Sequence, residues 1–114
     1  MKRALEVIGD SEQPIFVHII LLTHHHPYDH VGNVTGDRRA SIEEDYLVSL
    51  RYVDAQIGTF YDSLKKSGEL EDTILAIYGD HDSGITADLA TRFGVETPSV
   101  LDTVPFVVAG LNGG

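Results

Sequence analysis

The sequence predicts an α/β fold built on a mostly parallel sheet flanked by helices. Two apolar runs, residues 15–22 and 74–78, have the length and continuity of strands that are buried on both faces. A long amphipathic segment, residues 41–67, lies between them and has the spacing of a helix. This order joins parallel strands by a right-handed crossover, so we expect both strands to end at the same edge of the sheet.

The composition is that of a folded protein with an acidic surface. The chain has 114 residues, enough for one small domain or a piece of one, with 42% hydrophobic and 23% charged residues. A formal net charge of −10 with only eight Lys and Arg argues against nucleic-acid binding. The absence of cysteine excludes disulfides, thiolate metal sites and cysteine nucleophiles. The longest apolar stretch, residues 15–23, is too short to span a membrane, and the first ten residues do not form a secretory signal.

The first half of the chain contains local signals for each element. Residues 4–10 are expected to be the end of a helix that stops at Gly9, and residues 29–40 to be a surface loop. Ser41 and Glu44 match a capping box and predict the start of the long helix. Its apolar stripe is predicted to pack on the sheet; the stripe consists of Tyr46, Leu50, Val53, Ile57, Phe60 and Leu64.

The end of the long helix and the second half of the chain also contain local signals for their elements. Lys65, Lys66 and Gly68 supply a basic last turn and a glycine stop. Residues 87–93 are expected to form a short helix that ends at Gly94, and residues 104–109 a third strand, with its proline at the start where proline is tolerated.

Gly79, Asp80 and His81 follow the strand at residues 74–78 and are the first candidate site. Asp oxygen and His nitrogen suit zinc or manganese, and ligands bind beyond the carboxyl ends of strands in open α/β sheets. We therefore predict that Asp80 and His81 are metal ligands, with Asp82 as a candidate partner for the second histidine nitrogen. The alternative interpretation is a plain turn, because Gly-Asp is a common turn pair.

Three consecutive histidines, residues 24–26, follow the first predicted strand. Adjacent side chains in extended backbone face opposite sides, so at most two of the three share a direction. A histidine here can donate a hydrogen bond to phosphate or protonate a leaving oxygen, and the alternative is a polar strand exit without a role. His18, inside the predicted strand, is expected to be a hydrogen-bonded core residue, and His30 to be solvated.

Other polar residues give weaker signals. Gly58 in the long helix is explained if the helix approaches the sheet closely, and Asp54 is either a buried anchor or part of a solvated face. Thr23 and Ser83 are hydroxyls near the predicted site, but no Ser-His-Asp order or glycine elbow surrounds them. We predict no nucleophile in this chain.

These motifs together resemble the sulfatase superfamily within the alkaline-phosphatase-like fold. The branch most similar is that of the lipoteichoic acid synthase and phosphoglycerol transferase enzymes. The resemblance covers about residues 11–110 and rests on order and spacing of three short motifs, at residues 25–28 (His-His-Pro-Tyr), 46–58 and 72–81. It implies a three-layer fold of which residues 1–114 form a single partial domain, the C-terminal portion of the catalytic domain.

The resemblance also implies the chemistry. Asp80 and His81 correspond to two ligands of a catalytic divalent metal, manganese or zinc, and His25 to a residue that contacts phosphate or the substrate head group. The implied reaction transfers phosphoglycerol from a phospholipid head group through a covalent threonine intermediate, at the extracytoplasmic face of a bacterial membrane. The substrate is a phosphate or sulfate ester, and contact with the membrane would come only through an upstream segment.

The departures from the family pattern define what the chain is expected to lack. The nucleophile, a further acidic metal ligand and a substrate-binding arginine lie upstream in family members, and nothing before Ile15 matches them. The 114-residue chain is therefore expected to be soluble, to bind metal weakly and to be inactive alone. A sulfatase, a phosphoethanolamine transferase and a phosphodiesterase remain alternatives within the superfamily. A non-catalytic truncated α/β module that binds a ligand or partner through its acidic surface is the alternative outside it.

Overall fold

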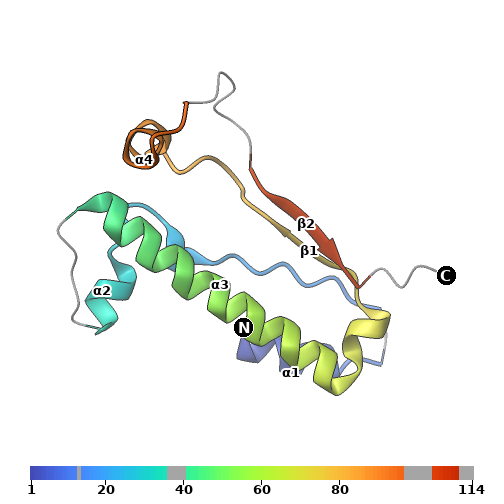
Figure 1. Ribbon diagram of the computed structural model, residues 1–114. Coiled ribbons are helices and arrows are strands. Elements are labelled where there is room, and N and C mark those ends of the chain that lie inside the picture. Colours follow the sequence, from blue (N-terminus) through green and yellow to red (C-terminus); the bar gives the residue numbers. More distant parts are fainter. Residues whose placement is uncertain (13, 36–40, 97–103, 111–114) are drawn as a thin grey trace.

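The computed structural model describes residues 1–12, 14–35, 41–96 and 104–110. One long helix, α3, runs along the molecule, with the other helices and a two-stranded sheet arranged around it (Figure 1). In chain order the elements are α1 (Lys2–Gly9), η1 (Leu22–His24), α2 (His30–Thr35), α3 (Ile42–Ser67), η2 (Glu69–Asp72), β1 (Leu75–Tyr78), α4 (Thr86–Phe93) and β2 (Phe106–Ala109).

Local signals determine both ends of α3, as the sequence predicts. The Ser41 hydroxyl accepts a hydrogen bond from the Glu44 backbone N–H at 3.3 Å, which satisfies one free amide of the first turn. Three acidic residues occupy that turn, and Lys65 and Lys66 occupy the last one, so both ends complement the helix dipole. Gly68 ends the helix in the left-handed conformation, with φ of 84°. α1 and α4 also end at the predicted glycines.

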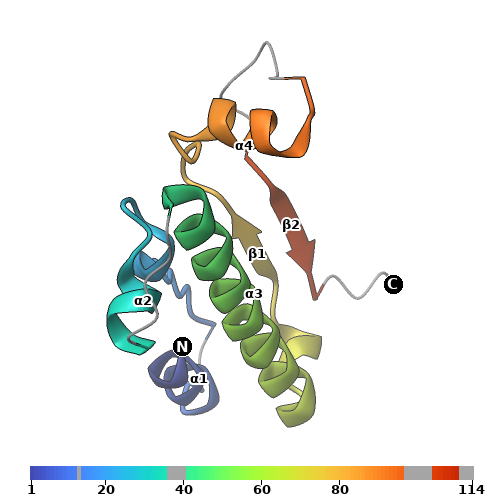
Figure 2. The ribbon, with the colours of Figure 1, turned by 60° about the vertical axis from the view of Figure 1, so that its left-hand side comes forward.

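The two strands that form are antiparallel, whereas the parallel pair was predicted between residues 15–22 and 74–78. β1 and β2 pair antiparallel, with Leu75 opposite Ala109 and Tyr78 opposite Phe106. β2 follows α4 in the chain and runs along β1 in the opposite direction (Figure 2).

The strand predicted for residues 15–22 is not formed either. Residues 14–21 are extended but not part of a ladder, and Leu22 begins η1. Predicted burial on both faces is also wrong, since Phe16 is 91% exposed and Ile20 68% exposed. An extended segment becomes a strand only when a neighbour takes its backbone hydrogen bonds, and no described residues do so here. The segment nevertheless runs in the same direction as β1 (Figure 1).

His18 is exposed and not in a core. Its ring stacks on Tyr78 of β1, with ring centroids 6.5 Å apart, and its Nε2 lies 3.4 Å from the Tyr78 hydroxyl. This contact is the point at which the extended segment lies beside β1.

The core of the described residues lies between α3 and the other helical elements, rather than between α3 and the sheet. α3 packs against α1, α2, η1 and η2. Its most buried apolar residues are Phe60 and Leu64, whereas Leu50 of the predicted stripe is 41% exposed. A Cβ at Gly58 would meet no described atom within 4 Å, so the expected close approach to the sheet is absent there. Asp54 belongs to the solvated face.

The molecule is flat and open. Its radius of gyration is 16.7 Å and its extents are 48 × 36 × 19 Å, whereas a closed domain of about 100 residues has a radius of gyration of about 13 Å. Many large apolar side chains are exposed, among them Ile74 and Phe106 of the sheet region. This shape is compatible with part of a larger α/β domain, and the three-layer arrangement stays a prediction.

Candidate metal and phosphate site

The Gly79-Asp80-His81 corner lies directly after β1, as predicted. The Gly79 N–H donates to the Pro105 carbonyl at 3.1 Å, which extends the pairing of the two strands to the corner. A Cβ at Gly79 would lie 3.2 Å from the Cβ of Val104, so glycine permits this close approach. The next two side chains are therefore presented at the end of the strand, and both are largely exposed.

The hydrogen bond of His81 fixes which ring nitrogen can bind a metal. Its Nδ1 lies 2.6 Å from the Asp82 backbone carbonyl, so Nδ1 carries the proton and donates it. Nε2 of the neutral ring is then left with a free lone pair. Asp82 is thus the partner of the second nitrogen through its carbonyl; its carboxylate instead accepts from the Gly84 N–H at 2.8 Å.

Asp80 and His81 fit a single metal ion as a pair of ligands. The His81 Nε2 and an Asp80 carboxylate oxygen are 3.8 Å apart. Zinc binds nitrogen and carboxylate oxygen at about 2.0–2.2 Å, so one ion can touch two atoms at this separation. Within the described ranges, no group of three or more His, Asp or Glu is arranged to hold an ion. The two residues are therefore half of a coordination shell at most.

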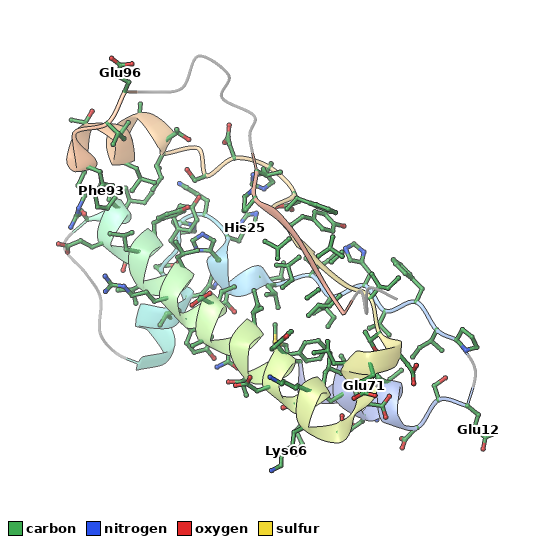
Figure 3. The ribbon with its side chains drawn as sticks, turned by 45° about the vertical axis from the view of Figure 1, so that its right-hand side comes forward. Glu12, His25, Lys66, Glu71, Phe93 and Glu96 are labelled. Atoms are coloured by element: carbon green, nitrogen blue, oxygen red, sulfur yellow. The ribbon has the colours of Figure 1, made fainter. Side chains whose placement is uncertain are left out.

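The three histidines of residues 24–26 have different surroundings. His24 points inward, and its Nδ1 donates to the Ser49 hydroxyl at 2.7 Å, since that hydroxyl itself donates to the Tyr46 carbonyl. His25 and His26 are exposed. The Nδ1 of His25 lies 2.8 Å from the His26 carbonyl, so its Nε2 is free, as in His81. In the view of Figure 3, His25 lies between α3 and the two strands.

An aromatic cluster formed by His24, Tyr28 and Tyr46 was not predicted as part of the site. Tyr28, only 4% exposed, packs against Tyr46 of α3 and against His24, with ring centroids 5.1 and 5.3 Å away. The Tyr28 hydroxyl donates to the Ser83 carbonyl in the loop after His81. The sequence signal for this cluster is the spacing of three between Tyr46 and Ser49, which places them on the same face of the helix.

Burial keeps the groups of this cluster neutral. It lowers the pKa of His24 and raises that of Tyr46. The pKa of Tyr28 is raised by burial first, and further by Tyr46 and by the Asp82 carboxylate. These side chains therefore act as neutral hydrogen-bonding groups near pH 7.

The loop that contains His25 and the loop that contains His81 lie close together. Their predicted site residues do not contact one another directly. Tyr28 and Ser83 join the loops, and an ion pair of 3.9 Å between Arg92 and Glu44 also ties α4 to the start of α3. Among the described residues, no hydrogen bond or ion pair joins His25 to Asp80 or His81. The Ser83 hydroxyl accepts from the Ile85 N–H at 3.3 Å, a turn-forming role.

The chain belongs to the sulfatase family, which matches residues 1–113. It is 32% identical over 89 residues to lipoteichoic acid synthase of Staphylococcus saprophyticus, covering 70% of the chain and 13% of that protein. It is 31% identical over 84 residues to lipoteichoic acid synthase 2 of Bacillus subtilis, with the same shares covered.

The expected relationship to lipoteichoic acid synthases is thereby confirmed, although the chain spans only 13% of the length of these relatives. No solved structure matches the chain significantly. Of the helices that the structure describes, none has the length and apolar character needed to cross a membrane.

Proposed function

We propose that the chain supplies half of the active site of a metal-dependent phosphoglycerol transferase. In this proposal Asp80 and His81 bind manganese or zinc, and His25 binds the phosphate of the ester substrate. The observation that carries it is the pairing of the His81 Nε2 with an Asp80 oxygen at the end of β1, in a chain that belongs to the sulfatase family. The relatives named lipoteichoic acid synthases favour phosphoglycerol transfer over sulfate ester hydrolysis.

The chain's own residues supply binding and orientation. The Asp82 carbonyl holds the His81 ring in the tautomer that leaves Nε2 available, and Asp80 adds negative charge beside it. His25 is held in the same way by the His26 carbonyl, so that when protonated it presents an Nε2–H to a phosphate oxygen. A metal bound here would polarise phosphoryl oxygens and lower the pKa of an attacking hydroxyl.

The acidic character of the chain explains why a bound metal is needed for an anionic substrate. The chain has a net charge of −10, which repels an anionic ester. A divalent cation bound to Asp80 and His81 would offset this negative charge locally. The nucleophile and the remaining metal ligands are proposed to come from other parts of the enzyme, located at the extracytoplasmic face of the membrane.

Manganese-induced line broadening in NMR spectra of the 114-residue protein tests this proposal. We expect the strongest broadening at the His81 ring and the Asp80 amide, and no selective effect at the exposed His30 ring. Inorganic phosphate added with manganese should then shift the His25 ring signals. Broadening centred on another acidic region, or spread evenly over the chain, would contradict the metal assignment.

A further inference from the structure

We propose that Tyr28 is a positioning residue that holds His25 at the correct distance from the Asp80–His81 pair. The inference rests on the proposed function and adds to it a residue that touches neither metal nor phosphate. Tyr28 is the described side chain that joins the loop of His25 to the loop of His81 by a hydrogen bond.

Tyr28 is bonded to both loops at points next to the site residues. Its backbone N–H donates to the His25 carbonyl at 2.8 Å, so the two residues share a tight turn. Its hydroxyl donates to the carbonyl of Ser83, two residues after His81. A displacement of one loop relative to the other therefore stretches the bond of the Tyr28 hydroxyl to Ser83.

Burial and packing hold the Tyr28 ring in one place, so the ring can fix the relative position of the two loops. It is 4% exposed, and its backbone φ is 69°, a conformation that tyrosine adopts only when its surroundings require it. Tyr46 packs edge-on to the ring, and His24 lies against it while bonded to the fully buried Ser49. The ring is thus fixed to the first turns of α3.

The loop that receives the Tyr28 hydroxyl is also ordered by its own bonds. The Asp82 carboxylate and the Ser83 hydroxyl each accept a backbone N–H two residues later, from Gly84 and Ile85. The Asp82 carbonyl in turn holds the His81 ring. A continuous series of contacts therefore runs from His25 through Tyr28 to His81.

A double-mutant cycle on phosphate affinity tests this role. In the 114-residue protein saturated with manganese, binding of inorganic phosphate is followed by calorimetry for wild type, His25→Ala, Tyr28→Phe and the double variant. Loss of a charge-assisted hydrogen bond lowers phosphate affinity about 10-fold or more in His25→Ala. We expect a similar loss in Tyr28→Phe, and less than about a twofold further loss in the double variant, because a displaced His25 no longer contributes.

Manganese affinity separates positioning from general damage. Tyr28→Phe keeps the ring in the cluster, so its manganese affinity should stay within about twofold of wild type. Tyr52→Phe, a matched change at a 45% exposed position of α3, should alter neither affinity. Losses that multiply in the double variant, or full phosphate affinity in Tyr28→Phe, would overturn the inference.

The outcomes also distinguish the inference from the proposed function. An unchanged phosphate affinity in His25→Ala, or no manganese binding by wild type, contradicts the proposed function and the inference with it. A normal effect of His25→Ala with none of Tyr28→Phe contradicts the inference alone. If Tyr28→Phe does not fold, zinc titration of wild type decides: zinc at Asp80 and His81 should shift the Tyr28 ring signals, and unmoved signals would refute the coupling.

Discussion

Replacement of Ser49 by alanine should destabilise the protein more than its small size suggests. Ser49 is fully buried, and its hydroxyl donates to the Tyr46 carbonyl at 2.9 Å and accepts from His24 at 2.7 Å. Alanine leaves the His24 Nδ1–H without its acceptor, which costs about 1–3 kcal/mol, and the better helix propensity of alanine offsets about 0.5 kcal/mol. We expect a net loss of about 1.5 kcal/mol in the free energy of unfolding.

Urea denaturation followed by circular dichroism measures this loss. With a slope of about 2 kcal/mol per molar urea, the midpoint should fall by roughly 0.75 M. Ser63→Ala is the matched control, because Ser63 lies on the same helix and donates to the Thr59 carbonyl at 2.7 Å without a second partner. Its stability should change by less than about 0.5 kcal/mol. Equal midpoints for the two variants would refute the argument.

Two further predictions concern the cap of α3 at Ser41 and the pH dependence of stability caused by His24. Ser41→Ala removes the bond to the Glu44 N–H and should cost about 1 kcal/mol by the same denaturation assay; an unchanged midpoint would show that the cap contributes nothing. Burial lowers the pKa of His24, so the folded chain binds a proton less readily than the unfolded chain. Stability should be complete above the unfolded-state pKa of about 6.5 and fall as pH drops through the lower folded-state pKa. His24→Asn should lose less stability than wild type between pH 8 and 5.5 in the same assay, and equal losses would contradict this argument.

Elements determined by neighbouring residues could be predicted from the sequence. The ends of α3 follow from Ser41 and Gly68, whose effects are confined to one turn. The location of Asp80 and His81 after a strand followed from the apolar run before them. Each of these signals lies within a few residues of the feature it determines.

Features that depend on distant partners could not be predicted. Residues 15–22 have the composition of a buried strand, but a strand also needs a neighbour for its backbone, and the described chain supplies none. The antiparallel pairing of β2 with β1 depends on contact between segments that lie far apart in the sequence. The bond from Tyr28 to Ser83 joins a side chain to a backbone carbonyl 55 residues away, and no local pattern marks it.

Calorimetric titration with manganese tests most directly whether Asp80 and His81 form a metal pair. Wild type and Asp54→Ala, a change at an exposed carboxylate of α3, should bind one ion with the same affinity. Asp80→Ala should bind at least about tenfold more weakly, because it leaves a single described ligand. Equal binding by wild type and Asp80→Ala would contradict the assignment of this corner as a metal site.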